Sequence, residues 1–123
     1  MKKQPNLEVQ ETAKAENKIQ QEIVMWYRNT YCLRHNSPRC MIFSVPNEGR
    51  GAASMRLIQT GLYPGCSDLV ILREDRTYFF EVKTPEGVQS DSQKEFQAHA
   101  EQMGIPYRIV RSLDDFKQVV RNL

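Results

Sequence analysis

The chain has 123 residues, a net charge of +2, 40% apolar residues and 26% charged residues, a composition that excludes disordered and fibrous classes and indicates one globular domain. No apolar run approaches the roughly 18 residues that span a bilayer, and the basic N-terminal residues lack the apolar stretch of a signal peptide. We therefore expect residues 1–123 to form a single domain in the cytosol, with no membrane partner. The charge permits nucleic-acid binding without requiring it, so evidence for binding must come from a site.

The first half of the chain predicts a long helix, a strand and a short helix. Residues 7–33 contain no Pro or Gly and repeat apolar residues at helical intervals, which is typical of an amphipathic helix. Turn residues at 36–38 break it. A short buried strand is expected at 40–45 and a helix at 52–60, closed by Gly61.

The second half predicts two strands joined by a tight polar turn, followed by a strand–helix–strand unit and a terminal helix. These elements are expected at 69–72, 77–83, 92–103, 106–111 and from Ser112 to the C-terminus. Strands joined by a tight turn pair antiparallel, whereas strands joined through a helix need a parallel, right-handed crossover. The predicted fold class is therefore α/β, a small mixed sheet flanked by helices in the order α-β-(α)-β-β-α-β-α.

The tight turn predicts how the two central strands pair. If residues 74–75 form the turn, Leu69 faces Phe80 and Asp68 faces Glu81. Directly opposed side chains share one face of the sheet, with β-carbons about 4.5–5.5 Å apart. Lys83 lies two residues beyond Glu81 and so points to the same side. The pairing therefore brings two carboxylates and one amine together.

Two carboxylates at this spacing repel, which destabilises a bare sheet. Mg²⁺ reverses the sign of this effect, because it prefers oxygen ligands and is commonly held by one or two carboxylates plus a substrate phosphate. The alternative interpretation is a solvated strand end, in which Glu81 and Lys83 form a minor ion pair and Asp68 caps a turn.

Asp68 on one strand, followed by Glu81-Val82-Lys83 on the next, resembles the PD-(D/E)XK nuclease superfamily. More narrowly, "TGLYPGCSDLVIL", "FFEVKTPEGVQSDSQKEF" and "GIPYRIVRSLDDF" resemble the VRR-NUC family of virus-type replication-repair nucleases, over roughly residues 16–120. The resemblance implies a restriction-endonuclease-like core. One departure is Ser67, which stands where the family usually has a proline and should loosen the turn.

The resemblance also implies the site residues. Asp68, Glu81 and the carbonyl of Val82 would bind Mg²⁺ or Mn²⁺, Lys83 would act in catalysis, and Gln93 matches the family's glutamine. The family's first-helix glutamate could be Glu11, Glu16 or Glu22. We favour Glu16 as a catalytic residue and metal ligand, because it shares a helical face with the apolar residues, whereas Glu22 points away from them.

The implied activity is metal-dependent hydrolysis of DNA phosphodiesters by an endonuclease, leaving a 5′-phosphate. Small stand-alone members resemble junction resolvases, which implies a homodimer acting on branched DNA such as a four-way (Holliday) junction. The small size is compatible with a phage or mobile-element origin. Arg50, Arg56 and Lys94 are candidate phosphate contacts, each of which would add to affinity and to salt sensitivity.

Two other function classes fit the sequence. The first is a catalytically silent nucleic-acid-binding module with the same fold. The second is a zinc-stabilised interaction protein, for which the possible ligands are Cys32, His35, Cys40 and Cys66. Thiols without a metal are the default for cysteines in a reducing compartment.

Overall fold

The computed structural model describes residues 7–32, 41–45, 52–74 and 76–123. The predicted break at 36–38 and the candidate phosphate contact Arg50 lie outside these residues. The elements follow one another in the predicted order: α1 (Leu7–Tyr27), η1 (Arg28–Cys32), β1 (Met41–Ser44), α3 (Ala52–Gln59), β2 (Leu69–Arg73), β3 (Arg76–Val82), α4 (Asp91–Gln102), β4 (Tyr107–Val110) and α5 (Leu113–Arg121). Within the described ranges, no helix is both long and apolar enough to cross a membrane.

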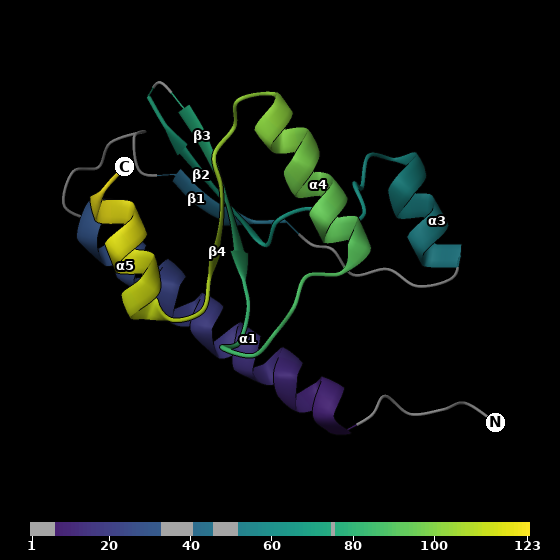
Figure 1. Ribbon diagram of the computed structural model, residues 1–123, viewed down its shortest axis with the longest axis horizontal. Coiled ribbons are helices and arrows are strands. Elements are labelled where there is room, and N and C mark those ends of the chain that lie inside the picture. Colours follow the sequence, from purple (N-terminus) through teal and green to yellow (C-terminus); the bar gives the residue numbers. More distant parts are fainter. Residues whose placement is uncertain (1–6, 33–40, 46–51, 75) are drawn as a thin grey trace.

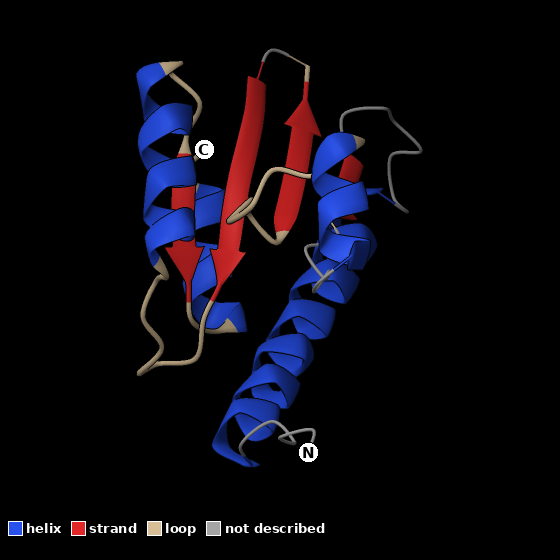
Figure 2. Cartoon of the chain, turned by 90° about the vertical axis from the view of Figure 1, so that its right-hand side faces the viewer, coloured by secondary structure: helices blue, strands red, loops and turns tan. Residues whose placement is uncertain are grey.

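The four strands form one mixed sheet in the order β1-β2-β3-β4. The predicted hairpin register is confirmed, since Leu69 pairs with Phe80 and Arg73 with Arg76. β3 and β4 are parallel, as the crossover through α4 requires, and β1 pairs antiparallel with β2. Figure 2 shows the strands side by side, with β2 running opposite to β3.

Helices cover both faces of the sheet. α1 and α5 lie on one side, and α4 lies on the other together with α3 (Figure 1). Alternating side chains of the strands therefore enter two separate cores. The larger core joins α1 and α5 to residues such as Ile71 and Phe80, and the smaller core packs Phe96 and Ala100 of α4 against Phe79 and Tyr107.

The predicted first helix divides into two parts. α1 ends at Tyr27, and Arg28–Cys32 continue as a wider π-helical turn. Trp26 and Tyr31, five residues apart, meet edge to face with ring centroids 5.8 Å apart, and Tyr27 and Tyr31 meet at 4.9 Å. Since a π turn aligns residues five apart, it lets these rings pack together beside α5.

Gly65 allows the loop before β2 to pack tightly against the start of α4. Its φ is +80°, and a β-carbon there would lie 2.2 Å from the carbonyl oxygen of Ser92 and 2.7 Å from the amide nitrogen of Gln93. Gly104 has a similar φ of +75°, with nothing among the described residues within 4 Å of the same position. A substitution at Gly104 therefore tests backbone strain alone, whereas the same substitution at Gly65 adds steric overlap.

Gly65→Ala should cost about 2–5 kcal/mol of unfolding free energy, because it adds backbone overlap to left-handed strain. Gly104→Ala should cost only about 1 kcal/mol, from the strain alone. Urea unfolding of both variants measures the difference. Equal losses would show that the Gly65 loop does not pack on α4 as described.

Candidate active site

Asp68 lies just before β2 and reaches across to β3. The ladder between the two strands ends at Leu69 and Phe80, so Asp68 stands one position beyond it. Its Oδ2 atom accepts a 2.7 Å hydrogen bond from the backbone N–H of Val82. Burial raises the pKa of Asp68, the Val82 N–H opposes this, and the Glu81 carboxylate raises the pKa further. The predicted approach of Asp68 and Glu81 is thus observed, with a backbone amide holding Asp68 in place.

Glu81 is the fully buried carboxylate of the site, with 0% of its surface exposed. Its Oε1 atom accepts a short hydrogen bond from the Tyr107 hydroxyl. Its Oε2 atom is buried and has no hydrogen-bond partner among the described residues. Buried polar atoms are almost always satisfied, so an exception of this kind indicates a functional position.

Glu16 and Lys83 complete a group of four interacting charges. Burial raises the pKa of Glu16, the Lys83 ammonium lowers it, and the Asp68 and Glu81 carboxylates raise it again. Lys83 is 9% exposed. Glu16 of α1 is half-buried. Residues from α1, from the loop before β2 and from β3 therefore share one electrostatic environment, which we call the acidic cluster (Glu16, Asp68, Glu81 and Lys83).

The other first-helix candidates lie elsewhere. Glu11 and Glu22 are exposed, whereas Glu16 is partly buried and responds to the charges of the other three cluster members. Of the three glutamates that the sequence leaves open, the geometry brings Glu16 to the site. Its role as a ligand stays a prediction.

Ser67 is fully buried, and its hydroxyl donates a 3.3 Å hydrogen bond to the carbonyl of Leu69. This bond braces the turn that precedes Asp68, and the expected loosening relative to a proline stays a prediction.

Gln93 takes part in a helix cap. Its Oε1 atom accepts a 2.8 Å hydrogen bond from the backbone N–H of Ser90, and its own N–H donates to the Ser90 hydroxyl at 3.3 Å. This reciprocal capping box starts α4 at Asp91, one residue before the predicted start. The side-chain carbonyl of Gln93 is thus engaged with the backbone, and its predicted part in catalysis stays a prediction.

Arg111 fixes the loop that follows Lys83. One guanidinium nitrogen donates to the carbonyls of Thr84 at 2.7 Å and Gly87 at 2.7 Å. The backbone N–H of Lys83 donates to Val110 at 3.0 Å. β4 therefore holds both Lys83 and the chain beyond it, a function of Arg111 that the sequence does not reveal.

Tyr107 is another residue that the sequence analysis does not identify. It is 2% exposed and belongs to the smaller core. Burial, and then its bond to Glu81, raise the pKa of Tyr107 above its usual range, whereas the polar side chain of Gln89 opposes the shift. Tyr107 therefore remains a protonated donor to Glu81.

The candidate phosphate contacts that the structure describes are exposed. Arg56 lies in the last turn of α3 and Lys94 in the first turn of α4, next to Gln93. Their exposure leaves them accessible to a polyanion, which is all that their positions establish.

The donor atoms of the acidic cluster suit a hard cation. In the described part of the chain, no three or more His, Cys, Asp or Glu side chains are grouped so that they could hold a metal ion as a protein cage. Mg²⁺ does not need such a cage, because it keeps several waters and is held by one or two carboxylates plus substrate oxygens. The unsatisfied Oε2 atom of Glu81, beside Asp68, fits that requirement.

The zinc interpretation is not supported by the cysteines that are described. Cys32 packs against the core under α1 and α5, whereas Cys66 packs against the core under α4. The sheet separates them, so they cannot share one ion. Burial also raises the pKa of the Cys66 thiol, which disfavours the thiolate that zinc requires. His35 and Cys40 lie outside the described residues.

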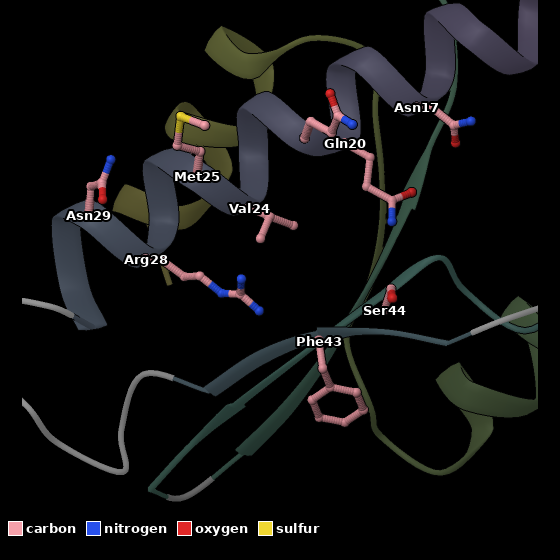
Figure 3. Close-up of a pocket in the computed structure, with 9 residues that line it drawn as sticks. Asn17, Gln20, Val24, Met25, Arg28, Asn29, Phe43 and Ser44 are labelled. Carbon is pink, nitrogen blue, oxygen red and sulfur yellow. The ribbon is translucent and has the colours of Figure 1, made fainter.

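A groove of about 890 Å³ lies between α1 and β1, next to the acidic cluster. Amide side chains from Asn17, Gln20 and Asn29 line it together with Arg28. Figure 3 shows Val24 of α1 and Arg28 of η1 pointing toward β1. It begins within one helical turn of Glu16. Glu16 itself lines a separate hollow of about 370 Å³ at the N-terminal end of α1. The larger groove thus adjoins the acidic cluster without containing it.

Neither a family model nor a curated protein matches the sequence. Solved structures similar to this chain include the following two. One, named "VRR_NUC domain protein", has a TM-score of 0.71 and 17% identity and covers 88% of this chain and 86% of that one. The other, "VRR_NUC domain", has a TM-score of 0.60 and 14% identity and covers 87% and 95%. The α/β fold that the resemblance implied is therefore confirmed as the fold of VRR-NUC domains.

Proposed function

We propose that this chain is a divalent-metal-dependent nuclease of the VRR-NUC family that hydrolyses DNA phosphodiesters. The observation that carries the proposal is the fully buried Glu81 carboxylate near Asp68, Glu16 and Lys83, one oxygen of which has no hydrogen-bond partner in the described part of the chain. Burying charges is costly unless they are paired. A protein that retains three carboxylates and one amine at the end of its sheet is expected to use them.

The cation in the proposal is Mg²⁺ or Mn²⁺. Asp68, Glu81 and the Val82 carbonyl would hold it, with Glu16 reaching it directly or through water. When bound, it would polarise the scissile phosphate and lower the pKa of a coordinated water. The all-oxygen donor set supports this choice over zinc.

The chain's own residues have separate tasks in this proposal. Lys83 orients the attacking water and stabilises the charge that develops on the phosphate, an effect that is strengthened because the residue is only 9% exposed. Gln93, at the start of α4, orients the same water or the phosphate. Arg56 and Lys94 bind neighbouring phosphates.

The preference for branched DNA, and the homodimer that would present two active sites to a four-way junction, rest on the family resemblance. These two statements are the most specific parts of the proposal. Comparing a four-way junction with linear duplex tests the preference, and gel filtration with light scattering tests the dimer.

Wild-type protein should cleave a labelled four-way junction in the presence of Mg²⁺ or Mn²⁺ and leave a 5′-phosphate. Asp68→Asn should reduce the cleavage rate by at least about 10²-fold, because it removes a charged ligand at almost constant shape. Asp114→Asn, an exposed position in the first turn of α5, is the matched control and should cleave at the wild-type rate.

Two outcomes would change the proposal. Wild-type turnover no faster than that of Asp68→Asn would remove catalysis, and salt-sensitive binding of DNA without turnover would then identify a silent binding module. Equal cleavage of linear and branched DNA would retain the nuclease and remove the junction preference.

A further inference from the structure

Tyr107 leaves only one oxygen of Glu81 open to a ligand. Its buried hydroxyl donates to Oε1, and Oε2 has no partner among the described residues. We propose that Tyr107 is a positioning residue that reserves Oε2 of Glu81 for the metal ion and prevents the carboxylate from binding through both oxygens. This inference rests on the proposed function, because it assumes that Glu81 is a metal ligand.

The sheet places Tyr107 for this task. In the parallel pairing of β3 and β4, Tyr107 is opposite Phe79 and Ile109 is opposite Glu81. Tyr107, Phe79 and Glu81 therefore point to the same face, and the phenol ring extends along β4 toward the carboxylate. Packing against Phe96, at a ring-centroid distance of 6.0 Å, limits the motion of the ring.

The physical effect is a restriction of the Glu81 carboxylate. A hydrogen bond from a neutral donor to a buried carboxylate is short and strong, since water does not compete for the oxygen. It occupies lone-pair density on Oε1 and resists rotation of the group about its last torsion. Mg²⁺ and Mn²⁺ favour octahedral sites with single-oxygen contacts and bound waters. Removing the hydroxyl should therefore weaken metal binding before it affects folding.

Tyr107→Phe tests this directly, because it deletes one hydroxyl and keeps the ring. Mn²⁺ titration by calorimetry, without DNA, should show a dissociation constant about 10–100-fold above that of the wild type, the usual effect of losing a residue that orients a metal ligand. In junction cleavage, the half-saturating Mn²⁺ concentration should rise by a similar factor, and the rate at saturating Mn²⁺ should fall less than tenfold. Tyr78→Phe is the control. Tyr78 is a buried tyrosine like Tyr107, but it lies on β3 and belongs to the core on the opposite face of the sheet.

The outcomes separate this inference from the nuclease function. A Tyr107→Phe variant that binds Mn²⁺ as tightly as the wild type and Tyr78→Phe overturns the role of Tyr107, even if DNA is cleaved. If the wild type binds Mn²⁺ but does not cleave DNA, the proposed nuclease function is wrong. The dissociation constants of the wild type and Tyr107→Phe for Mn²⁺ still test the role of Tyr107. If Tyr107→Phe does not fold, Tyr107→Met deletes the same hydroxyl and fills the space of the ring with a flexible apolar side chain. Weaker Mn²⁺ binding by that variant supports the inference, and unchanged binding overturns it.

Discussion

Replacing Lys83 by methionine should lower the rate of DNA cleavage by about 10²–10³-fold without weakening Mn²⁺ binding. The loss is the usual result of removing one group that stabilises charge in the transition state. Metal binding should be kept or improved, because Lys83 now offsets the negative field at Glu16 and Asp68. Loss of the catalytic Lys83 should therefore lower the cleavage rate, whereas loss of the positioning residue Tyr107 should raise the dissociation constant for Mn²⁺.

Lys117→Met is the matched control for this experiment. Lys117 lies on α5 with its amine 5.4 Å from the Trp26 ring centroid, so its loss removes the same charge on the α1–α5 side of the sheet. It should cleave at the wild-type rate. A Lys83→Met variant that cleaves within threefold of the wild type would show that Lys83 is structural. Loss of Mn²⁺ binding would show that it supports the ligands instead.

The hairpin part of the site was predictable from local sequence rules. A two-residue turn fixes the antiparallel register, and the period of two then assigns each side chain to a face. Asp68, Glu81 and Lys83 could therefore be brought together without knowledge of the rest of the fold. The ladder stops one residue earlier than the extrapolation from the turn, and Asp68 gains the Val82 N–H as a partner.

Other parts depend on how distant elements pack. The choice among Glu11, Glu16 and Glu22 requires the position of α1 on the sheet, which the helical period alone does not supply. The alignment of β4 with β3 is set by a long crossover through α4, and no turn rule fixes such a register. Tyr107 lies on β4 and Arg111 directly follows it. Their contacts with Glu81 and with the Thr84 carbonyl are long-range consequences of α4 packing.

The helix ends also divide into those set by local sequence and those set by tertiary packing. α4 and α5 start at serine caps, Ser90 and Ser112, a residue type that is typical of helix N-termini. The π turn after Tyr27 has no such mark, because it results from three aromatic rings packing beside α5. Local chemistry thus predicts where helices begin, and tertiary packing decides how this one ends.

In the absence of metal, Asp68→Asn should be more stable than the wild type by about 0.5–1 kcal/mol at pH 7, the scale of one like-charge pair on a sheet. Asparagine can still accept a hydrogen bond from the Val82 N–H through its carbonyl oxygen, so the main change is the loss of a charge that burial and Glu81 disfavour.

The pKa of Asp68 is raised above the value of about 3.9 found in unfolded chains. The folded protein therefore holds this proton more tightly, and wild-type stability falls as the pH rises from about 3.9 through the raised pKa. The advantage of the variant should disappear at low pH, where the wild-type carboxyl is protonated.

Mn²⁺ should reverse this order. A ligand that binds only the folded state stabilises it by about 2.7 kcal/mol at one hundred times its dissociation constant, and Asp68→Asn should lose most of this gain. Chemical denaturation at pH 7 and at low pH, with EDTA and with Mn²⁺, measures all four conditions, with Asp114→Asn as the exposed control. If Asp68→Asn is less stable than the wild type in EDTA, the native carboxylate stabilises the fold by itself. If Mn²⁺ stabilises both proteins equally, the ion binds elsewhere. We expect Asp68→Asn to be the more stable protein in EDTA and the wild type to be the more stable protein in Mn²⁺. This reversal is specific to two carboxylates that the fold holds close together and whose repulsion a bound cation removes.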